Sequence, residues 1–70
     1  MDVSFNKLFK MLIDKGMKKK DFREKVDISE STMAKLSNNE NVSLEVIARI
    51  CRAMDCTVDD IMDVLPDKTE

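Results

Sequence analysis

The sequence contains no histidine, a single glycine and a single proline, and each shortage argues against a class of protein. Histidine is the commonest general acid–base group and metal ligand, so its absence disfavours most hydrolytic and metal-dependent enzymes. One glycine and one proline leave almost no material for hairpin turns, which argues against an all-β fold. We therefore expect no catalytic residues, no metal site and no cofactor.

Long apolar runs are also missing. No stretch of the sequence approaches the roughly 20 apolar residues that a membrane-spanning helix needs. The first residues lack the apolar segment and the small-residue cleavage site of a signal peptide. We expect a cytoplasmic protein that makes no contact with a membrane.

The chain has only two cysteines, Cys51 and Cys56. Without a histidine they cannot complete a four-ligand zinc site by themselves. If both lay on one helix, their five-residue separation would correspond to about 7.5 Å of axial rise, beyond easy disulfide reach. We expect reduced thiols that are at least partly buried.

Charge is abundant and unevenly distributed. Of the 70 residues, 37% are charged and 43% hydrophobic, which suits one small domain over residues 1–70. Residues 7–35 carry nine Lys or Arg against five Asp or Glu, a balance of +4, and residues 36–70 carry three against eight, a balance of −5. A basic half suits a polyanionic partner, although ordinary solvated helix faces would give the same counts.

The spacing of apolar residues predicts helices in the first half of the chain. An apolar stripe from Phe5 to Ile13 predicts a helix over 4–15, with Ser4 as its N-cap and Gly16 as its left-handed stop. A short helix over 19–26 and a third over 30–38, capped by Ser29, follow.

Two further helices are predicted in the second half. In residues 42–50 apolar and polar residues alternate, as they would in a strand. The helical pattern of apolar residues extends further along the chain, Ser43 can cap the helix, and the sequence offers no partner strand. We therefore expect a helix that reaches Met54. Thr57 and Asp60 resemble a capping box that opens a fifth helix, which Pro66 ends, leaving a frayed tail over 66–70. The expected fold is an all-α, compact five-helix bundle.

The second and third predicted helices are separated by only three residues. In the third helix Met33 and Leu36 form a narrow apolar stripe, and the remaining side chains are small or polar. A recognition helix that enters a major groove about 12 Å wide needs an outer face of this kind. The pair therefore indicates a helix-turn-helix over about 18–38.

The run MKKKDFREKVDISESTMAKL, residues 17–36, resembles the Cro/phage-repressor (XRE-type) helix-turn-helix family. The continuation over 39–47 resembles a compact, stand-alone bacterial branch of that family, and the resemblance covers about residues 3–65. It implies a lambda-repressor-like DNA-binding domain that acts as a transcriptional repressor or autoregulator. Its most specific parts are Ile28-Ser29 before Ser31-Thr32-Met33, and Ser43-Leu44 at the start of the fourth helix.

Three positions depart from the commoner family pattern. Lys19 replaces a frequent Gln and still reaches phosphate as a point charge. Arg23 replaces a small residue. Its aliphatic chain must therefore lie over the contact between the second and third helices, with the guanidinium group in water. Asp27 replaces the turn Gly, and Asp tolerates a left-handed conformation better than most residues.

The resemblance also implies which residues meet DNA. Lys35 is expected to donate hydrogen bonds to guanine O6 and N7. Glu30 either accepts a hydrogen bond from cytosine N4 or only stabilises the positive N-terminus of its helix. Ser31 either contacts a base or is an ordinary surface residue. Thr32 contacts a base or a phosphate, or it supports the turn, which is the interpretation that we favour. Lys18 and Lys20 add diffuse attraction to the expected phosphate contacts, which are Lys19, Ser29, Asn38, Asn41 and Ser43.

The family logic further implies a homodimer on an inverted repeat of double-stranded DNA, with Ile61, Val64 and Leu65 as candidate contacts. A protein-interaction module, such as the antitoxin half of a toxin–antitoxin pair that uses the acidic half of the chain, is the alternative. An enzyme is not expected, because the sequence contains no nucleophile–base pair, phosphate loop or metal set.

Overall fold

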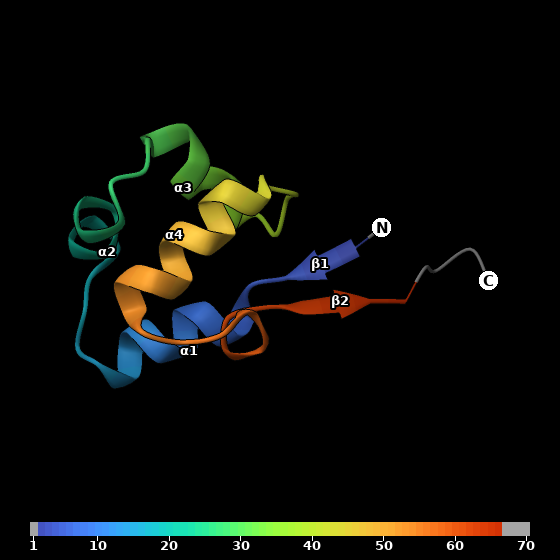
Figure 1. Ribbon diagram of the computed structural model, residues 1–70, viewed down its shortest axis with the longest axis horizontal. Coiled ribbons are helices and arrows are strands. Elements are labelled where there is room, and N and C mark those ends of the chain that lie inside the picture. Colours follow the sequence, from blue (N-terminus) through green and yellow to red (C-terminus); the bar gives the residue numbers. More distant parts are fainter. Residues whose placement is uncertain (1, 67–70) are drawn as a thin grey trace.

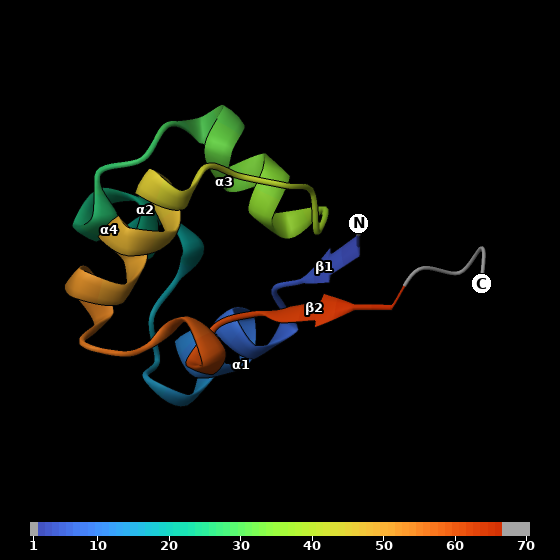
Figure 2. The same cartoon turned by 45° about the vertical axis from the view of Figure 1, so that its right-hand side comes forward.

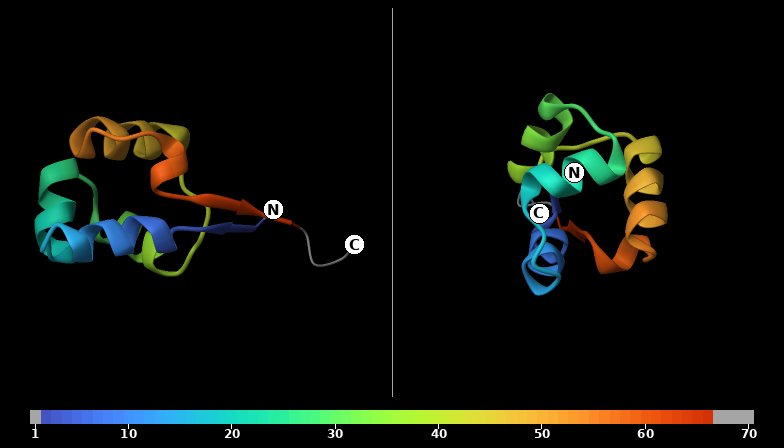
Figure 3. Two further views of the ribbon diagram at one scale, coloured as in Figure 1. Left: turned by 90° about the horizontal axis from the view of Figure 1, so that it is seen from below. Right: turned by 90° about the vertical axis from the view of Figure 1, so that its left-hand side faces the viewer.

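The computed structural model describes residues 2–66 and contains four helices and a small β-ribbon within that range. The helices carry the labels of Figure 1, and β1 and β2 lie side by side and project away from them (Figure 3). The elements in chain order are β1 (Asp2–Ser4), α1 (Asn6–Asp14), α2 (Lys19–Val26), α3 (Glu30–Ser37), α4 (Leu44–Met54), the single 3-10 turn η1 (Val58–Asp60) and β2 (Asp63–Leu65).

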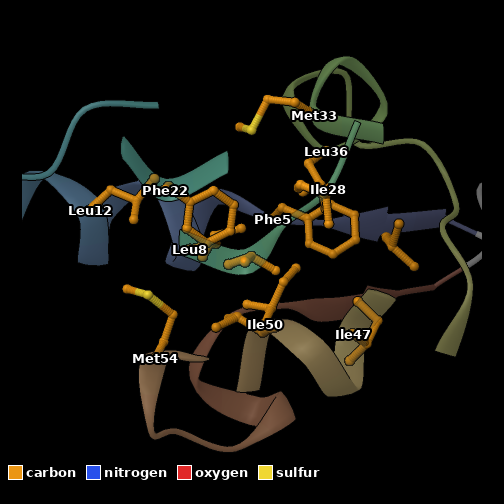
Figure 4. Close-up of a cluster of buried hydrophobic side chains, with 13 residues drawn as sticks. Phe5, Leu8, Leu12, Phe22, Ile28, Met33, Leu36, Ile47, Ile50 and Met54 are labelled. Carbon is orange, nitrogen blue, oxygen red and sulfur yellow. The ribbon is translucent and has the colours of Figure 1, made fainter. Parts of the chain in front are cut away.

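One apolar core joins all four helices. Side chains from α1, α2, α3 and α4 point toward one another in Figure 4, and the largest that are fully buried include Phe5, Phe22 and Leu36. Met33 and Leu36 are both buried, as their spacing predicts. The sequence therefore identified the inward side of α3 correctly.

Two predicted apolar stripes are only partly buried. Ile13 at the end of α1 is 78% exposed and Leu44 at the start of α4 is 85% exposed. On α4 the buried side chains are Ile47, Ile50 and Met54, so the inward face is rotated away from Leu44. A periodic stripe sets the side of a helix that is apolar, but the neighbouring elements decide how much of it they cover.

Each of the four helices is followed by a residue in the left-handed region of φ. These residues are Gly16 (φ 65°), Asp27 (φ 63°), Asn39 (φ 57°) and Asp55 (φ 54°). Only the first is a glycine, and the other three are Asp or Asn, whose short polar side chains tolerate this conformation best. The predicted left-handed stops at Gly16 and Asp27 are confirmed.

The prediction of a fifth helix is wrong. Thr57 and Asp60 form the expected capping box, with Thr57 N donating to Asp60 Oδ2 at 3.0 Å, but the helix closes after the one turn of η1. The chain then extends into β2, which pairs antiparallel with β1 in the register Asp2↔Leu65, Val3↔Val64 and Ser4↔Asp63. The fold is thus mostly helical and fits the predicted all-α class, but residues 2–66 form four helices, and a short ribbon replaces the fifth because β1 and β2 satisfy each other's backbone groups.

The β-ribbon also moves the start of the first helix. Ser4 lies in β1 and is buried, so the expectation that it caps a helix is wrong, and Phe5 occupies the N-cap position. Lys7 on α1 holds the other strand at the same end of the ribbon: its Nζ lies 3.0 Å from Asp63 Oδ1 and donates to the Asp59 carbonyl at 3.1 Å. The hydrogen bond with Asp63 raises the pKa of Lys7 above its ordinary value.

Both cysteines are free and partly buried. Cys51 lies in the last turn of α4 and Cys56 beyond its end, so the two do not share a helix. Burial raises the pKa of the Cys56 thiol, and the neighbouring Cys51 raises it further. Of the tail predicted to fray, only Pro66 is among the described residues, and 67–70 lie outside them.

Ile61 was expected at a dimer interface, but its side chain is 0% exposed and belongs to the core. We predict that Ile61→Ala lowers the free energy of unfolding by about 2–5 kcal/mol, because it leaves a cavity. Urea denaturation followed by circular dichroism measures this. Ile13→Ala, at an exposed apolar site, is the control and should change stability by less than about 1 kcal/mol. Equal effects of the two substitutions would contradict the placement of Ile61.

Candidate nucleic-acid interface

The turn between α2 and α3 is closed by local backbone hydrogen bonds. Asp27 N and Ile28 N both donate to the Arg23 carbonyl, at 2.9 and 3.2 Å. Asp27 supplies the left-handed conformation that reverses the chain, and the buried Ile28 anchors the turn in the core. Because α3 begins only three residues after α2 ends, this turn fixes the direction in which α3 leaves.

Ser29 caps α3. Its Oγ accepts from Thr32 N at 3.2 Å, and its hydroxyl donates to Thr32 Oγ1 at 3.0 Å. Ser29 Oγ also lies 3.1 Å from Ser31 Oγ. Thr32 is partly buried and its hydroxyl is engaged in this cap, which favours the interpretation that it supports the turn.

The outward face of α3 is free. Figure 2 places α3 at the outer edge of the bundle, on the opposite side from α1. Met33 and Leu36 point into the core, so the small and polar side chains turn to the surface. Every expected surface position on this helix is exposed, namely Glu30, Ser31, Ala34, Lys35 and Asn38.

Lys18, Lys19 and Lys20 form an exposed lysine cluster at the start of α2, and the side chain of Lys19 is held in place. Lys19 Nζ lies 5.1 Å from the centre of the Phe9 ring and donates to Ser37 Oγ at 3.5 Å. These contacts bring the ammonium of Lys19 beside the last turn of α3. Ser37 did not figure among the predicted site residues, since nothing in the local sequence pairs it with Lys19.

Three predicted site residues, Asn38, Asn41 and Ser43, follow α3 and lie in different surroundings. Ser43 is the N-cap of α4, and its Oγ accepts from Val46 N at 3.2 Å, which leaves its O–H free to donate. Asn38 Nδ2 donates to Glu40 Oε2 at 3.5 Å. Asn41 and Lys35 line one open hollow, and Asp2 and Glu40 also line it.

Asn39, which the sequence did not identify, connects this end of α3 to the ribbon. Its Oδ1 accepts from Phe5 N at 2.8 Å, across 34 residues of sequence. The left-handed conformation of Asn39 turns its side chain out of the helix path and toward β1. The structure thus assembles the predicted residues around both ends of α3, with Ser29 and Glu30 at one end and Lys35, Asn38 and Asn41 at the other.

The sequence of the chain matches a known family. A family model described as a Cro/C1-type HTH DNA-binding domain matches residues 7–67 of the sequence. The chain belongs to this family. Helices α2 and α3 lie within residues 18–38, where the sequence predicts the helix-turn-helix.

A solved relative agrees with this assignment. The crystal structure of the transcriptional regulator VanUg is 53% identical in sequence and superposes with a TM-score of 0.89, over 94% of this chain and 88% of that one. No curated protein gives a significant match. Within the part of the Cro/C1-type domain that the structure describes, none of the helices has the length and apolar character required to span a bilayer.

The left-handed turn residue of the Cro/C1-type domain yields a prediction. Asp27→Gly should leave the free energy of unfolding unchanged or raise it by up to about 1 kcal/mol, because glycine adopts positive φ without strain. Asp27→Val should lower it by about 1–2 kcal/mol, because a β-branched residue is strained there. Chemical denaturation measures both.

Glu24→Val is the matched control, since Glu24 is exposed at a helical position of α2 and the cost there is below about 0.7 kcal/mol. Equal losses for Asp27→Val and Glu24→Val would show that the left-handed conformation carries no special constraint.

Proposed function

We propose that the chain is a sequence-specific DNA-binding transcriptional regulator, a repressor or autoregulator that reads the major groove with α3. The observation that carries the proposal is the exposed face of α3, where small side chains surround Lys35 while Met33 and Leu36 hold the helix on the core. The name of the solved relative, a transcriptional regulator, supports the same class of function. Occupying a promoter is the simplest action of such a domain, which is why repression is proposed.

Base recognition is assigned to the exposed part of α3. Lys35 donates to guanine O6 and N7, Glu30 accepts from cytosine N4, and Ser31 adds an unselective contact. Glu30 also lies in the first turn, where a carboxylate stabilises the helix dipole whether or not it meets a base. Thr32 has the weakest claim among the four, since its hydroxyl takes part in the cap.

Phosphate contacts are assigned to the ends of three helices. Lys19 presents a positioned ammonium beside α3, and Lys18 and Lys20 add diffuse attraction. Ser29 and Ser43 cap α3 and α4, whose N-terminal N–H groups are suited to phosphate oxygens. Asn38 and Asn41 extend the contact along the loop between these helices.

We propose a second copy of the chain as the protein partner. An apolar hollow lies between the start of α4, η1 and the ribbon, and none of its lining residues is charged. Leu44, Val58 and Val64 at its rim are all largely exposed. In the proposed dimer, a two-fold axis brings the exposed side chain of Leu44 of each copy to the hollow of the other.

The ribbon supports the same face. Asn39 is hydrogen-bonded to Phe5, directly after β1, whereas the outer edge of β2 has no hydrogen-bonded neighbour among residues 2–66. An open, partly apolar edge pairs readily with an identical strand around a two-fold axis. Val64 and Leu65 remain candidate contacts, and the buried Ile61 is replaced by Leu44 and Val58.

A toxin partner rests on the acidic residues of the C-terminal half alone, and no contact in the structure favours it over DNA. Pull-down of a basic protein encoded beside this one is the measurement that would promote it. Regulation of transcription requires access to DNA and no chemistry of its own, so we assign the protein to the cytoplasm and give it no catalytic role.

The central test is selection of bound sites from random DNA, followed by fluorescence anisotropy across a salt series. Lys35→Met should weaken binding to the selected site about 10- to 100-fold and relax the preference at one base pair. Lys18→Met should weaken binding to all sequences alike and reduce the salt slope by about 1. Lys10→Met, at an exposed position of α1, is the control. Binding that ignores sequence at every salt concentration would overturn the proposal.

The dimer has its own test. Val64→Glu should give a folded monomer in sedimentation velocity, because it buries a carboxylate at the centre of the proposed interface. Ile13 is another exposed apolar residue and lies outside the hollow, so the Ile13→Glu variant should dimerise as the wild type does. A wild-type chain that stays monomeric at concentrations that saturate the selected DNA would refute this part of the proposal.

A further inference from the structure

Arg49 on α4 reaches across to the turn of the helix-turn-helix. Its Nη1 donates to the carbonyl oxygen of Asp27 at 3.0 Å, and its Nη2 pairs with Glu45 Oε2 at 3.2 Å. The side chain is about half covered, at 43% exposure. One guanidinium therefore joins α4 to the residue that reverses the chain between α2 and α3.

The carbonyl of Asp27 is a sensitive point of the motif. The last carbonyls of a helix have no partner within the helix, and here the chain has just turned through a left-handed residue. The Asp27–Ile28 peptide leads directly into Ser29, the cap of α3. A donor that fixes this carbonyl fixes the orientation of the peptide from which α3 starts.

We propose that Arg49 is a positioning residue for the recognition helix: it holds the turn at Asp27 in a fixed relation to α4. The inference rests on the proposed function, since it concerns how α3 is aimed at DNA. Both α3 and α4 present their N-termini on the proposed interface, so their relative orientation decides whether Glu30 and Ser43 meet one duplex together.

The planar fork of arginine suits this role. Two terminal nitrogens of one rigid group bond to two different elements at once, which the single ammonium of lysine reproduces poorly. Glu45, one turn earlier on α4, holds the guanidinium plane from the other side. With both terminal nitrogens engaged inside the protein, Arg49 acts through the turn and not by gripping a phosphate itself.

The test measures affinity for the selected DNA site and its dependence on salt. Arg49→Met should weaken binding about tenfold with an unchanged slope of log K against log salt, because no phosphate contact is lost. Arg49→Lys should recover part of the affinity, and Glu45→Gln should lose about two- to threefold. Arg52→Met is the matched control, since Arg52 lies exposed on the same helix and has no ion pair within residues 2–66.

Amide hydrogen exchange without DNA gives an independent readout. Arg49→Met should speed exchange at Ile28 and Thr32, whereas Arg52→Met should leave it unchanged. Unchanged exchange at the turn, wild-type affinity in Arg49→Met, or a salt slope reduced by about 1 would each overturn the positioning role. A wild-type protein with no preferred DNA site would instead overturn the proposed function, and the exchange result would still decide whether Arg49 holds the turn.

Discussion

Burial of Met33 and Leu36 determines which side of α3 faces solvent, and the candidate interface depends on that rotation. Because successive helical residues are about 100° apart, fixing these two side chains in the core turns Glu30, Ser31 and Lys35 outward. The left-handed turn at Asp27 and the cap at Ser29 then set where the helix begins. The candidate interface therefore relies on packing first and on the polar residues of α3 second.

The β-ribbon could not be read from the local sequence. Val58, Ile61, Met62 and Leu65 follow helical spacing, and the capping box at Thr57 does form, so each local signal agrees with a helix. The partner strand lies some 60 residues away at the other end of the chain and is only three residues long. Pairing of Val3 with Val64, reinforced by Lys7 on Asp63, overrides the local preference once the helices have packed.

Features set by neighbours in sequence were predictable, and those set by neighbours in space were not. The caps at Ser29 and Ser43 and the left-handed stop at Gly16 follow from local hydrogen bonding and φ preference. The bonds from Lys19 to Ser37, Asn39 to Phe5 and Arg49 to Asp27 join residues 18 to 34 positions apart. For the same reason, the sequence predicted the buried residues, the cap and the turn of α3, but not the long-range bonds of Lys19, Asn39 and Arg49 around it.

On the proposed function, the charge of a single copy gives only weak general attraction to DNA. The chain carries a net charge of −2, and Asp2 and Glu40 line the same hollow as Lys35. Affinity that is independent of sequence grows with the number of phosphates neutralised, and the acidic residues of the chain offset the attraction of its exposed lysines. In the proposed dimer, two copies joined at the ribbon double both the phosphate contacts and the bases read. We therefore propose that the uncharged hollow and the weakly basic interface are two parts of one arrangement, in which dimerisation supplies the affinity that the charge of a single chain does not.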